Sequence, residues 1–382
     1  MRRIRVGIIG TGFIGPAHVD ALRRLPNVDV VGLADIDEAA ARGKADALGV
    51  PAAFGDYHAL LSCPDIEAVH ICTPNHLHAR MATDALNAGK HVVCEKPLAV
   101  DVGEAAALVE LAARTGLVNA VHFNVRYYPL MRQVRLMRES GELGNVFSIH
   151  GSYLQDWLFR DTDWNWRLEP GLSGRSRAVA DIGSHWMDLV EHVSGLRITE
   201  VMADFATFHP VRRRPVRSAE TYSGRGDAST DTREVPIETE DYATVLFHFD
   251  NGAHGALTVS QVAAGRKNRI SLEIDGSREA VAWDSECPNA LWIGRRDEAN
   301  GLLLKDPPLA HPQARALMGF PGGHAEGFPD TSKQLFREVY ARIAGGASGG
   351  APSFPTFADG FRELVLCERI LQSRDSRTWV RV

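Results

Sequence analysis

Lys96, Asp181 and His185 are the residues of this sequence whose types and spacing point most clearly to chemistry. Lys96 lies in a Glu-Lys-Pro motif, and Asp181 and His185 lie four residues apart in an Asp-x-Gly-x-His motif. A neutral imidazole within hydrogen-bond reach of a hydroxyl group accepts its proton, and an ammonium group stabilises the negative charge that develops on the oxygen. Asp181 would orient that imidazole or bind hydroxyl groups of the substrate. The set therefore predicts proton removal from an alcohol.

Each of these residues has a structural alternative. Lys96 can be a surface lysine before a proline, Asp181 can be a helix N-cap, and His185 can be a satisfied core histidine. The four-residue spacing favours the chemical interpretation, because it puts Asp181 and His185 on one face of a helix. Asp188 and His192 continue that face, and we interpret both as structural.

A Gly-x-Gly-x-x-Gly motif at residues 10–15 follows the first predicted strand and opens a helix, and Asp35 lies 20 positions after its last glycine. Such glycines permit a tight turn, close approach of a pyrophosphate, and close packing of helix on strand. Asp35 would accept hydrogen bonds from the adenosine ribose and repel a 2′-phosphate, so we expect NAD, with NADP less favoured. The alternative is a glycine turn that binds no nucleotide. The predicted cofactor residues in this region are Gly10, Gly12, Phe13, Ile14, Gly15 and Asp35.

Two further motifs follow predicted strands, at residues 73–78 and 95–97. Ligands of open parallel sheets bind at the carboxyl ends of the strands, so we expect both motifs to flank the nicotinamide half of the cofactor. A metal site built from His70, His76 and His78 is disfavoured because their side chains would point in different directions, and no metal is predicted. The additional predicted cofactor residues are Thr73, Pro74, Asn75, His78, Glu95 and Lys96.

The elements that must position these residues fall into two predicted domains. Residues 1–125 alternate buried strands (4–9, 28–34, 68–72, 91–94, 117–121) with helices (14–25, 37–48, 76–88, 101–114), which predicts an α/β Rossmann domain with a doubly wound parallel sheet. Residues 126–382 predict an α/β domain for substrate binding and oligomerisation, with a large, mostly antiparallel open sheet. Its expected helices are 130–140, 181–194 and 357–372, the last packing back on the body of the protein, and its expected strands are 146–153, 243–249, 255–262, 269–274, 280–283 and 291–293. Residues 210–238 are expected to form a long surface excursion, and residues 345–350 a flexible connector.

Composition narrows the function classes. The 382 residues carry a formal net charge of −6, which gives no general attraction to nucleic acid or to an anionic membrane. The longest apolar runs are too short to span a membrane, and the basic N-terminus leads straight into the first strand. The five cysteines are odd in number and form no Cys-x-x-Cys pair, so we expect a reducing cytoplasm. An uncovered face of the large sheet would favour a homodimer or homotetramer.

The Glu-Lys-Pro motif at 95–97 and the Asp-x-Gly-x-His-x-x-Asp motif at 181–188 together resemble the Gfo/Idh/MocA family of oxidoreductases, which includes glucose–fructose oxidoreductase and inositol dehydrogenase. The resemblance covers nearly the whole chain and implies a Rossmann domain followed by an open-sheet domain. It also implies that Lys96, Asp181 and His185 are the catalytic residues. The segments 153–157, 164–167 and 322–328 look similar to the sugar-oxidising branch that includes levoglucosan dehydrogenase.

That resemblance implies a sugar or polyol as the small-molecule substrate. Aromatic faces would cover C–H surfaces and amides would bind hydroxyl groups, although core packing is the alternative for each aromatic residue. The predicted substrate-binding residues are Lys96, Arg126, Tyr153, Gln155, Trp157, Trp164, Asp181, His185 and His324. Where many family members carry small residues before the Asp-x-Gly motif, this chain has Arg175 and Arg177, which would narrow the pocket or bind an anionic group. The run at 212–214, three arginines, is interpreted as a solvated loop, and a phosphorylated or acidic substrate as a lesser alternative.

The sequence thus predicts an NAD-dependent dehydrogenase that oxidises a secondary hydroxyl of a sugar, sugar derivative or inositol. Two alternatives remain open. One is an NAD-assisted glycoside hydrolase or eliminase with no net redox change, and the other is a non-catalytic NAD sensor. The sequence leaves open which sugar and which carbon react, and in which direction.

Overall fold

The computed structural model describes residues 2–216, 231–345 and 350–382 of the chain. These residues divide into two compact units. Unit 1 comprises Met1–Phe123, Gly171–Gly174 and Ser332–Leu364, and unit 2 comprises Asn124–Pro170, Arg175–Thr331 and Val365–Val382. Two segments beyond residue 125 therefore belong with unit 1. The predicted connector at 345–350 and the middle of the predicted excursion lie largely outside the described residues.

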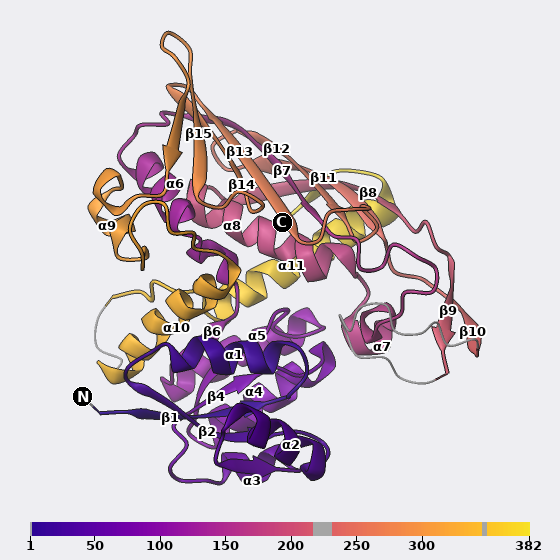
Figure 1. Ribbon diagram of the computed structural model, residues 1–382. Coiled ribbons are helices and arrows are strands. Elements are labelled where there is room, and N and C mark those ends of the chain that lie inside the picture. The colour runs from indigo at the N-terminus through magenta and orange to yellow at the C-terminus, as the bar shows by residue number, and fades with distance from the viewer. Residues whose placement is uncertain (1, 217–230, 346–349) are drawn as a thin grey trace. The chain divides into compact units, whose positions relative to one another are not determined.

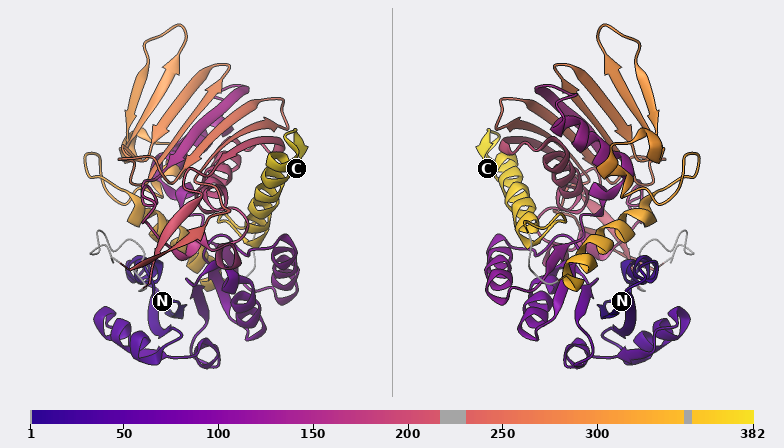
Figure 2. Two further views of the ribbon diagram at one scale, coloured as in Figure 1. Left: turned by 90° about the vertical axis from the view of Figure 1, so that its right-hand side faces the viewer. Right: turned by 90° about the vertical axis from the view of Figure 1, so that its left-hand side faces the viewer.

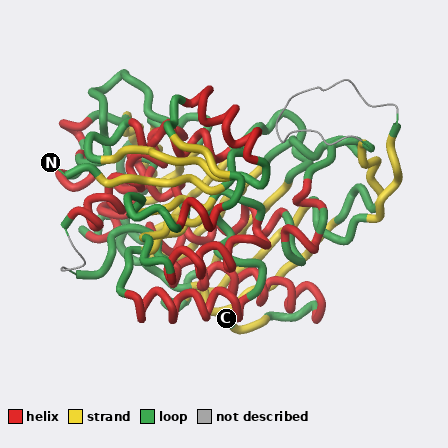
Figure 3. Tube along the Cα trace, turned by 90° about the horizontal axis from the view of Figure 1, so that it is seen from below, coloured by secondary structure: helices red, strands yellow, loops and turns green. Residues whose placement is uncertain are grey.

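Unit 1 is built on a parallel sheet whose described strands run in the order β3-β2-β1-β4-β5-β6. The order reverses between β1 and β4, as in a doubly wound nucleotide-binding sheet. Helices pack on both faces of this sheet (Figures 2 and 3). The strands are β1 (Ile4–Ile9), β2 (Val28–Ala34), β3 (Ala52–Phe54), β4 (Ala68–Ile71), β5 (His91–Cys94) and β6 (Asn119–Val121). The helices are α1 (Ile14–Arg23), α2 (Glu38–Leu48), α3 (Tyr57–Leu61), η1 (Asn75–Leu77), α4 (His78–Asn87) and α5 (Val102–Thr115).

Local signals in the sequence explain these boundaries. Asp37 and Asp101 are the N-caps of α2 and α5, and each side chain accepts hydrogen bonds from two backbone N–H groups of its helix. Gly49 and Gly116 end the same helices in the left-handed conformation. The strand β1 is a continuous apolar run because both of its faces are covered.

Unit 2 is built on a sheet with the order β16-β15-β14-β13-β7-β12-β11-β8-β17 among the described strands. Its neighbours pair antiparallel except β7 and β12, which are parallel, so the prediction of a mostly antiparallel sheet is confirmed. The strands are β7 (Val146–Leu154), β8 (Ile198–Ala206), β11 (Tyr242–Phe249), β12 (His254–Ser260), β13 (Arg269–Gly276), β14 (Glu279–Asp284), β15 (Ala290–Arg295), β16 (Gly301–Leu304) and β17 (Val380–Arg381).

Helices cover one face of this sheet. The helices α6 (Pro129–Glu139) and α8 (Ser184–Ser194) and the last turns of α11 (Phe357–Ser376) lie on this face (Figures 1 and 2). Their buried side chains and the inward side chains of the strands form one apolar core. Trp186 on α8 is fully buried in this core and donates to the carbonyl of Ser271, with an Nε1–O distance of 2.9 Å. The remaining helical segments are η2 (Asn124–Tyr127), η3 (Trp166–Leu168), α7 (Pro170–Ser173), η4 (Val179–Gly183), η5 (Pro307–Leu309), α9 (Pro312–Arg315) and α10 (Phe328–Ala344). None of the helices in the described ranges is long and apolar enough to cross a membrane.

The predicted excursion at 210–238 is structured at both ends. Residues Val211–Pro215 form β9 and Thr232–Pro236 form β10, and the two strands pair antiparallel. The interpretation of residues 212–214 as a solvated loop is therefore wrong for Arg212. Its side chain is fully buried and donates to the carboxylate of Asp241 over 2.8 Å.

Candidate active site

The glycine motif forms a turn that leaves its backbone open. Gly10 has φ of +96°, and a Cβ atom on it would lie 2.6 Å from the carbonyl oxygen of Cys72, so a larger residue is excluded there. A Cβ on Gly12, by contrast, would meet no described atom within 4 Å. The backbone before α1 is thus accessible to a ligand at the point where a helix N-terminus favours phosphate.

Asp35 follows β2 and holds this turn. One carboxylate oxygen accepts from the backbone N–H of Thr11 over 2.9 Å and from the Thr11 hydroxyl, and the other accepts from the N–H of Ile36 over 2.8 Å. Phe13 is 60% exposed and Ile36 is 91% exposed, so apolar surface flanks the carboxylate. A carboxylate for ribose hydroxyls, apolar surface for a base and an open glycine turn fit a dinucleotide.

His78 ties together the two other loops predicted to contact the cofactor. Its Nδ1 lies 2.7 Å from the carbonyl oxygen of Pro97, and its Nε2 lies 2.8 Å from that of Thr73. Burial lowers the pKa of His78, and the hydrogen bonds to the two carbonyl groups oppose that shift. Asn75 donates from Nδ2 to the carbonyl of Ser173 over 3.1 Å, so its amide holds the Gly171–Gly174 segment within unit 1.

Lys96 and Glu95 follow β5 directly. The Lys96–Pro97 peptide bond is cis. Lys96 is half-buried, and its backbone N–H donates to a carboxylate oxygen of Glu95 over 3.3 Å. Glu95 itself is buried. The cofactor residues predicted from the sequence thus lie on the turns and loops that follow β1, β2, β4 and β5 of one sheet.

In unit 2, Asp181 lies in a π-helical turn rather than at the start of an α-helix. The turn is η4, and α8 begins after it at Ser184. The interpretation of Asp181 as an N-cap is therefore wrong. Its carboxylate instead accepts from Nε of Arg167 over 3.3 Å and from Nε2 of Gln261 over 2.9 Å. Such single π-turns are frequent at functional sites.

The π-turn is anchored by buried charges on the segment that precedes β11. One carboxylate oxygen of Glu240 accepts from the backbone N–H groups of Arg177 and Val179, over 2.9 and 3.0 Å. The Arg177 guanidinium is fully buried and pairs with Asp241, which also pairs with Arg212. Burial alone would raise the pKa of Asp241, but the two guanidinium groups lower it. Arg177 therefore braces the turn, and the expectation that it lines the substrate pocket is wrong; Arg175 is exposed.

Four residues near Asp181 and His185 form a hydrogen-bonded group. The hydroxyl of Tyr153 and Nε2 of Gln155 each donate to Oδ1 of Asn268 over 2.8 Å. Trp157 in turn donates to Oε1 of Gln155 over 2.7 Å. The rings of Tyr153 and His185 have centroids 6.2 Å apart. Three of the predicted substrate residues thus hold one another in fixed orientations next to His185.

Arg167 links this group to Asp181. Its guanidinium carbon lies 4.5 Å from the ring centroid of Trp166 and 6.0 Å from that of Trp157, while its Nε donates to Asp181. Trp164 packs in the same small apolar cluster as Trp157, with the guanidinium of Arg214 lying 5.1 Å from its ring centroid.

Two predicted substrate residues have other surroundings. Arg126 donates through two nitrogens to the buried carboxylate of Asp188, so its guanidinium fixes α8. Burial and the nearby arginines hold the pKa of His192 well below its usual range, so it acts as a neutral acceptor beside Arg126. His324 is exposed, and its Nδ1 lies 3.2 Å from the carbonyl of Gly322.

Gln261 and Asn268 were missed in the sequence. Both lie in the stretch between β12 and β13, where polar residues are usual in a turn, so their types carried no signal. Asp181, to which Gln261 donates, is 80 residues away from it along the chain. The pairing of β12 with β7, which no sequence pattern specifies, places Gln261 beside the residues that follow β7.

Comparisons with known proteins agree with this geometry. Residues 4–123 match the model described as an oxidoreductase family with an NAD-binding Rossmann fold, and residues 131–282 match the GFO/IDH/MocA C-terminal domain. The chain belongs to the Gfo/Idh/MocA family of oxidoreductases. The levoglucosan dehydrogenase of Pseudarthrobacter phenanthrenivorans is 31% identical, over 100% of this chain and 99% of that protein.

Solved structures of family members give the same result. Levoglucosan dehydrogenase in complex with NADH and L-sorbose superposes with a TM-score of 0.89 at 29% identity, covering 100% of this chain and 99% of that one. An inositol dehydrogenase homologue complexed with NAD⁺ from Azotobacter vinelandii superposes with a TM-score of 0.86 at 28% identity, covering 100% and 98%. Unit 1 of this Gfo/Idh/MocA protein is thus an NAD-binding Rossmann unit, and the protein is an oxidoreductase of a family of sugar and inositol dehydrogenases.

Proposed function

We propose that this protein is an NAD-dependent dehydrogenase that oxidises a secondary hydroxyl of a sugar, sugar derivative or inositol. In this proposal His185 is the base, Lys96 polarises the hydroxyl oxygen, and Asp181 orients the substrate or the imidazole. Convergence of Lys96 and His185 on one alcohol is part of the proposal. The relatives named as levoglucosan and myo-inositol 2-dehydrogenases support the substrate class.

The observation that carries the proposal is the fixed group around Asp181. Arg167 and Gln261 hold its carboxylate one helical turn before His185, and Gln155, Trp157 and Asn268 are held in the same unit. Carboxylate, amide and indole groups in fixed orientations suit a ligand that presents several hydroxyl groups and C–H faces. Predominantly apolar pockets, by comparison, suit less polar ligands.

The chemistry required of these side chains is limited. As the C–H bond of the carbinol breaks, the nicotinamide supplies the acceptor for the hydride. The hydroxyl proton passes to a nitrogen of neutral His185, and the ammonium of Lys96 stabilises the negative charge on the oxygen until the carbonyl forms. The products are a ketone, the reduced cofactor and a proton on His185, which solvent then removes.

A panel of sugars and polyols tests the proposal, with NAD and NADP each supplied and reduced nicotinamide measured by absorbance. We expect turnover with NAD that Lys96→Ala and His185→Ala each abolish, while both variants still bind NAD. Near-normal turnover in both variants would refute the assignment of the two residues. Product without net reduced cofactor would instead identify a redox-neutral hydrolase or eliminase.

We also propose that the protein is a homodimer or homotetramer that associates through the uncovered face of the nine-stranded sheet in unit 2. Strand registers place Leu246, His150, Trp292 and Leu302 in one row across that face. Leu246 is 42% exposed, Trp292 is 36% exposed and Leu302 is 63% exposed. His150 and Glu273 lie in the middle of this row, and the exposed apolar side chains toward its two ends fit contact between two copies. We propose a cytoplasmic location as well, because all five cysteines are free and a reducing compartment keeps thiols in that state.

A further inference from the structure

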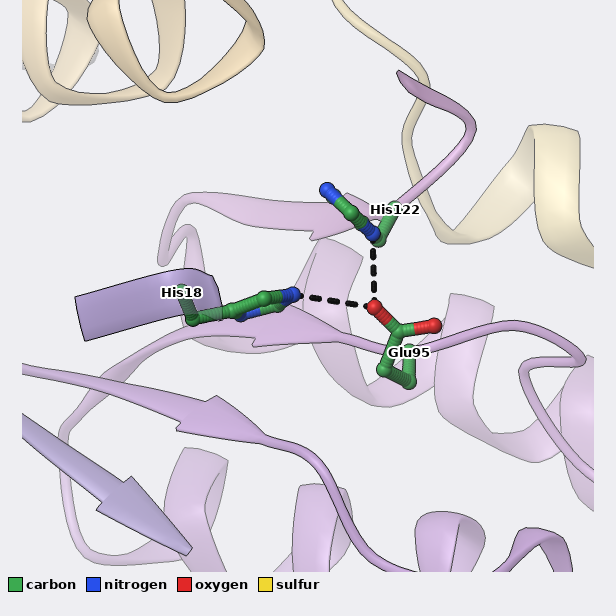
Figure 4. A group of neighbouring side chains, drawn as sticks. All are labelled: His18, Glu95 and His122. Atoms are coloured by element: carbon green, nitrogen blue, oxygen red, sulfur yellow. Dashed lines mark hydrogen bonds and ion pairs between the residues drawn. The ribbon is translucent and has the colours of Figure 1, made fainter. Parts of the chain in front are cut away.

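Glu95 lies in a buried cluster in unit 1, where it contacts His18 and His122 (Figure 4), and a third histidine, His70, contacts His18. His18 comes from α1, His70 from β4, and His122 directly follows β6, while Glu95 directly follows β5. Each of the four residues is at most 7% exposed. These residues come from the glycine-motif helix and from three strands of the sheet, so the cluster lies beneath the loops of the cofactor site rather than in a distant part of the unit.

The cluster is one continuous chain of hydrogen bonds. Oε1 of Glu95 lies 2.9 Å from Nε2 of His18 and 2.6 Å from Nδ1 of His122. Nδ1 of His18 lies 2.8 Å from Nδ1 of His70. The chain ends on α10, because Nε2 of His70 lies 2.8 Å from the hydroxyl of Tyr340, and Nε2 of His122 lies 2.9 Å from that of Ser332.

Counting protons along this chain gives an arrangement with neutral imidazoles throughout. A carboxylate only accepts, so His18 and His122 both donate to Glu95. A neutral His18 that donates from Nε2 must accept at Nδ1, so His70 donates from Nδ1. His70 then accepts at Nε2 from the Tyr340 hydroxyl, and His122 accepts at Nε2 from Ser332. In this arrangement of neutral imidazoles every donor points toward Glu95, and Glu95 is the one charged member of the cluster.

The surroundings support this count. Burial, which would raise the pKa of Glu95, is outweighed by His122 and His18, and its pKa lies well below the usual range. Burial lowers the pKa of His18 to about 4 and holds that of His70 well below its usual range. A carboxylate with neutral His18 and His70 beside it is therefore the state expected at neutral pH.

A metal ion fits these distances less well. Imidazole nitrogens and carboxylate oxygens bind zinc about 2 Å away in a tetrahedral arrangement, which keeps two ligand atoms about 3.3 Å apart. The separations of 2.6 and 2.9 Å from Oε1 are those of hydrogen bonds. The second nitrogen of each of His18 and His122 also already has a partner of its own.

The position of the charge suggests its use. Asp35 marks the adenosine half of the sheet at the end of β2, so the nicotinamide half lies over the ends of β4, β5 and β6. Glu95 and His122 are the first residues after β5 and β6. An oxidised nicotinamide ring carries a positive charge that is lost when it accepts a hydride. A fixed negative charge at this edge therefore acts differently on the two forms of the cofactor.

We propose that Glu95, held as a carboxylate by His18, His70 and His122, is a positioning residue that makes this protein bind oxidised NAD in preference to NADH. Glu95 acts on the cofactor through its charge, and on Lys96 through the hydrogen bond to the Lys96 backbone. The proposal rests on the NAD-binding unit and does not depend on which alcohol is oxidised.

Glu95→Gln in the full-length protein tests the proposal, because it removes the charge and keeps the side-chain size. Dissociation constants for NAD⁺ and NADH are measured by calorimetry and by NADH fluorescence, without substrate. Because the variant loses an attraction that only the positively charged ring feels, we expect the ratio of the NAD⁺ dissociation constant to the NADH dissociation constant to rise about tenfold. Glu110→Gln, an exposed glutamate on α5, is the matched control and should leave the ratio unchanged.

If Glu95 had only a structural role, the substitution would weaken the binding of NAD⁺ and NADH by the same factor. An unchanged ratio of the two dissociation constants in folded Glu95→Gln therefore overturns the proposal. If that variant does not fold, the protonation states of the histidines in the wild-type protein test the proposal instead. Long-range ¹H–¹⁵N spectra of its histidines should show neutral rings, protonated at Nε2 in His18 and at Nδ1 in His70 and His122. A doubly protonated His18 or His122, or a stoichiometric metal ion that His122→Ala loses, overturns it.

Discussion

Gln261→Met should lower activity without unfolding the protein. Gln261 is fully buried and donates from Nε2 to Asp181 over 2.9 Å, while its Oε1 has no hydrogen-bond partner among the described residues. Methionine keeps the length of the side chain and removes both polar groups. A hydrogen bond to a charged group contributes about 1.5–3 kcal/mol. Because Arg167 still holds Asp181, we take about 2 kcal/mol, which corresponds to about a thirtyfold loss in kcat/KM.

The stability of this variant should change little. Removing an unpartnered buried carbonyl stabilises the folded state, and this offsets the loss of the bond to Asp181. The assay is NAD-linked turnover of the best sugar from the panel, together with a thermal melt and NAD binding. Gln133→Met is the matched control, since Gln133 is buried in the same unit and accepts from the backbone of His311. A kcat/KM within twofold of the wild type, with the melt unchanged, would show that the orientation of Asp181 does not matter.

Four further predictions concern other parts of the molecule. Asp35→Asn should weaken NAD binding about tenfold by calorimetry, because it removes a charged acceptor from the ribose and from Thr11; unchanged affinity would contradict the assignment of Asp35. Lys305→Met should lower the free energy of unfolding, measured by urea denaturation, by about 3 kcal/mol, because it leaves the buried carboxylate of Glu326 without its cation. A loss below about 1 kcal/mol would show that this ion pair is not needed for stability. Leu246→Asp should convert the oligomer to smaller species in light scattering, whereas an unchanged mass would exclude this face as the contact. The free energy of unfolding should fall by about 3 kcal/mol as the pH drops from about 6.5 to about 4. His18 has a pKa of about 4 in the folded state and 6.5 in the unfolded state, so over this range the unfolded state binds one more proton. His18→Gln should flatten this pH dependence.

The Rossmann unit was largely predictable because its signals are local. Strands 4–9, 28–34 and 91–94 have the bounds that their apolar runs predicted, and Asp37 and Gly49 bracket α2 as their types indicate. The short β3 and α3 were missed because three and five residues carry too little periodicity. The prediction of the sheet order as doubly wound is confirmed by the reversal between β1 and β4.

Unit 2 was less predictable because its decisive contacts are remote in sequence. The strand β8 was missed since its residues alternate only weakly, and it finds its place by pairing with β11. Arg177 was predicted to lie near the substrate pocket because its partner, Asp241, is 64 residues away and cannot be recognised from the sequence. The π-turn at Asp181 also has no sequence signature, because the same residues fit an α-helix.

Buried charges, more than apolar contacts, hold the loops that carry the candidate site residues. Glu240 binds the backbone of the π-turn, and Glu95 binds the backbone of Lys96. Lys305 donates to the carbonyl groups of Phe320 and His324 as well as to Glu326. Each of these charged side chains makes several specific hydrogen bonds to its loop, which favours the arrangement of the loop that provides them. Substitutions at these three residues should therefore disturb the site more than substitutions of the half-buried tryptophans around it, although none of the three is expected to touch the substrate.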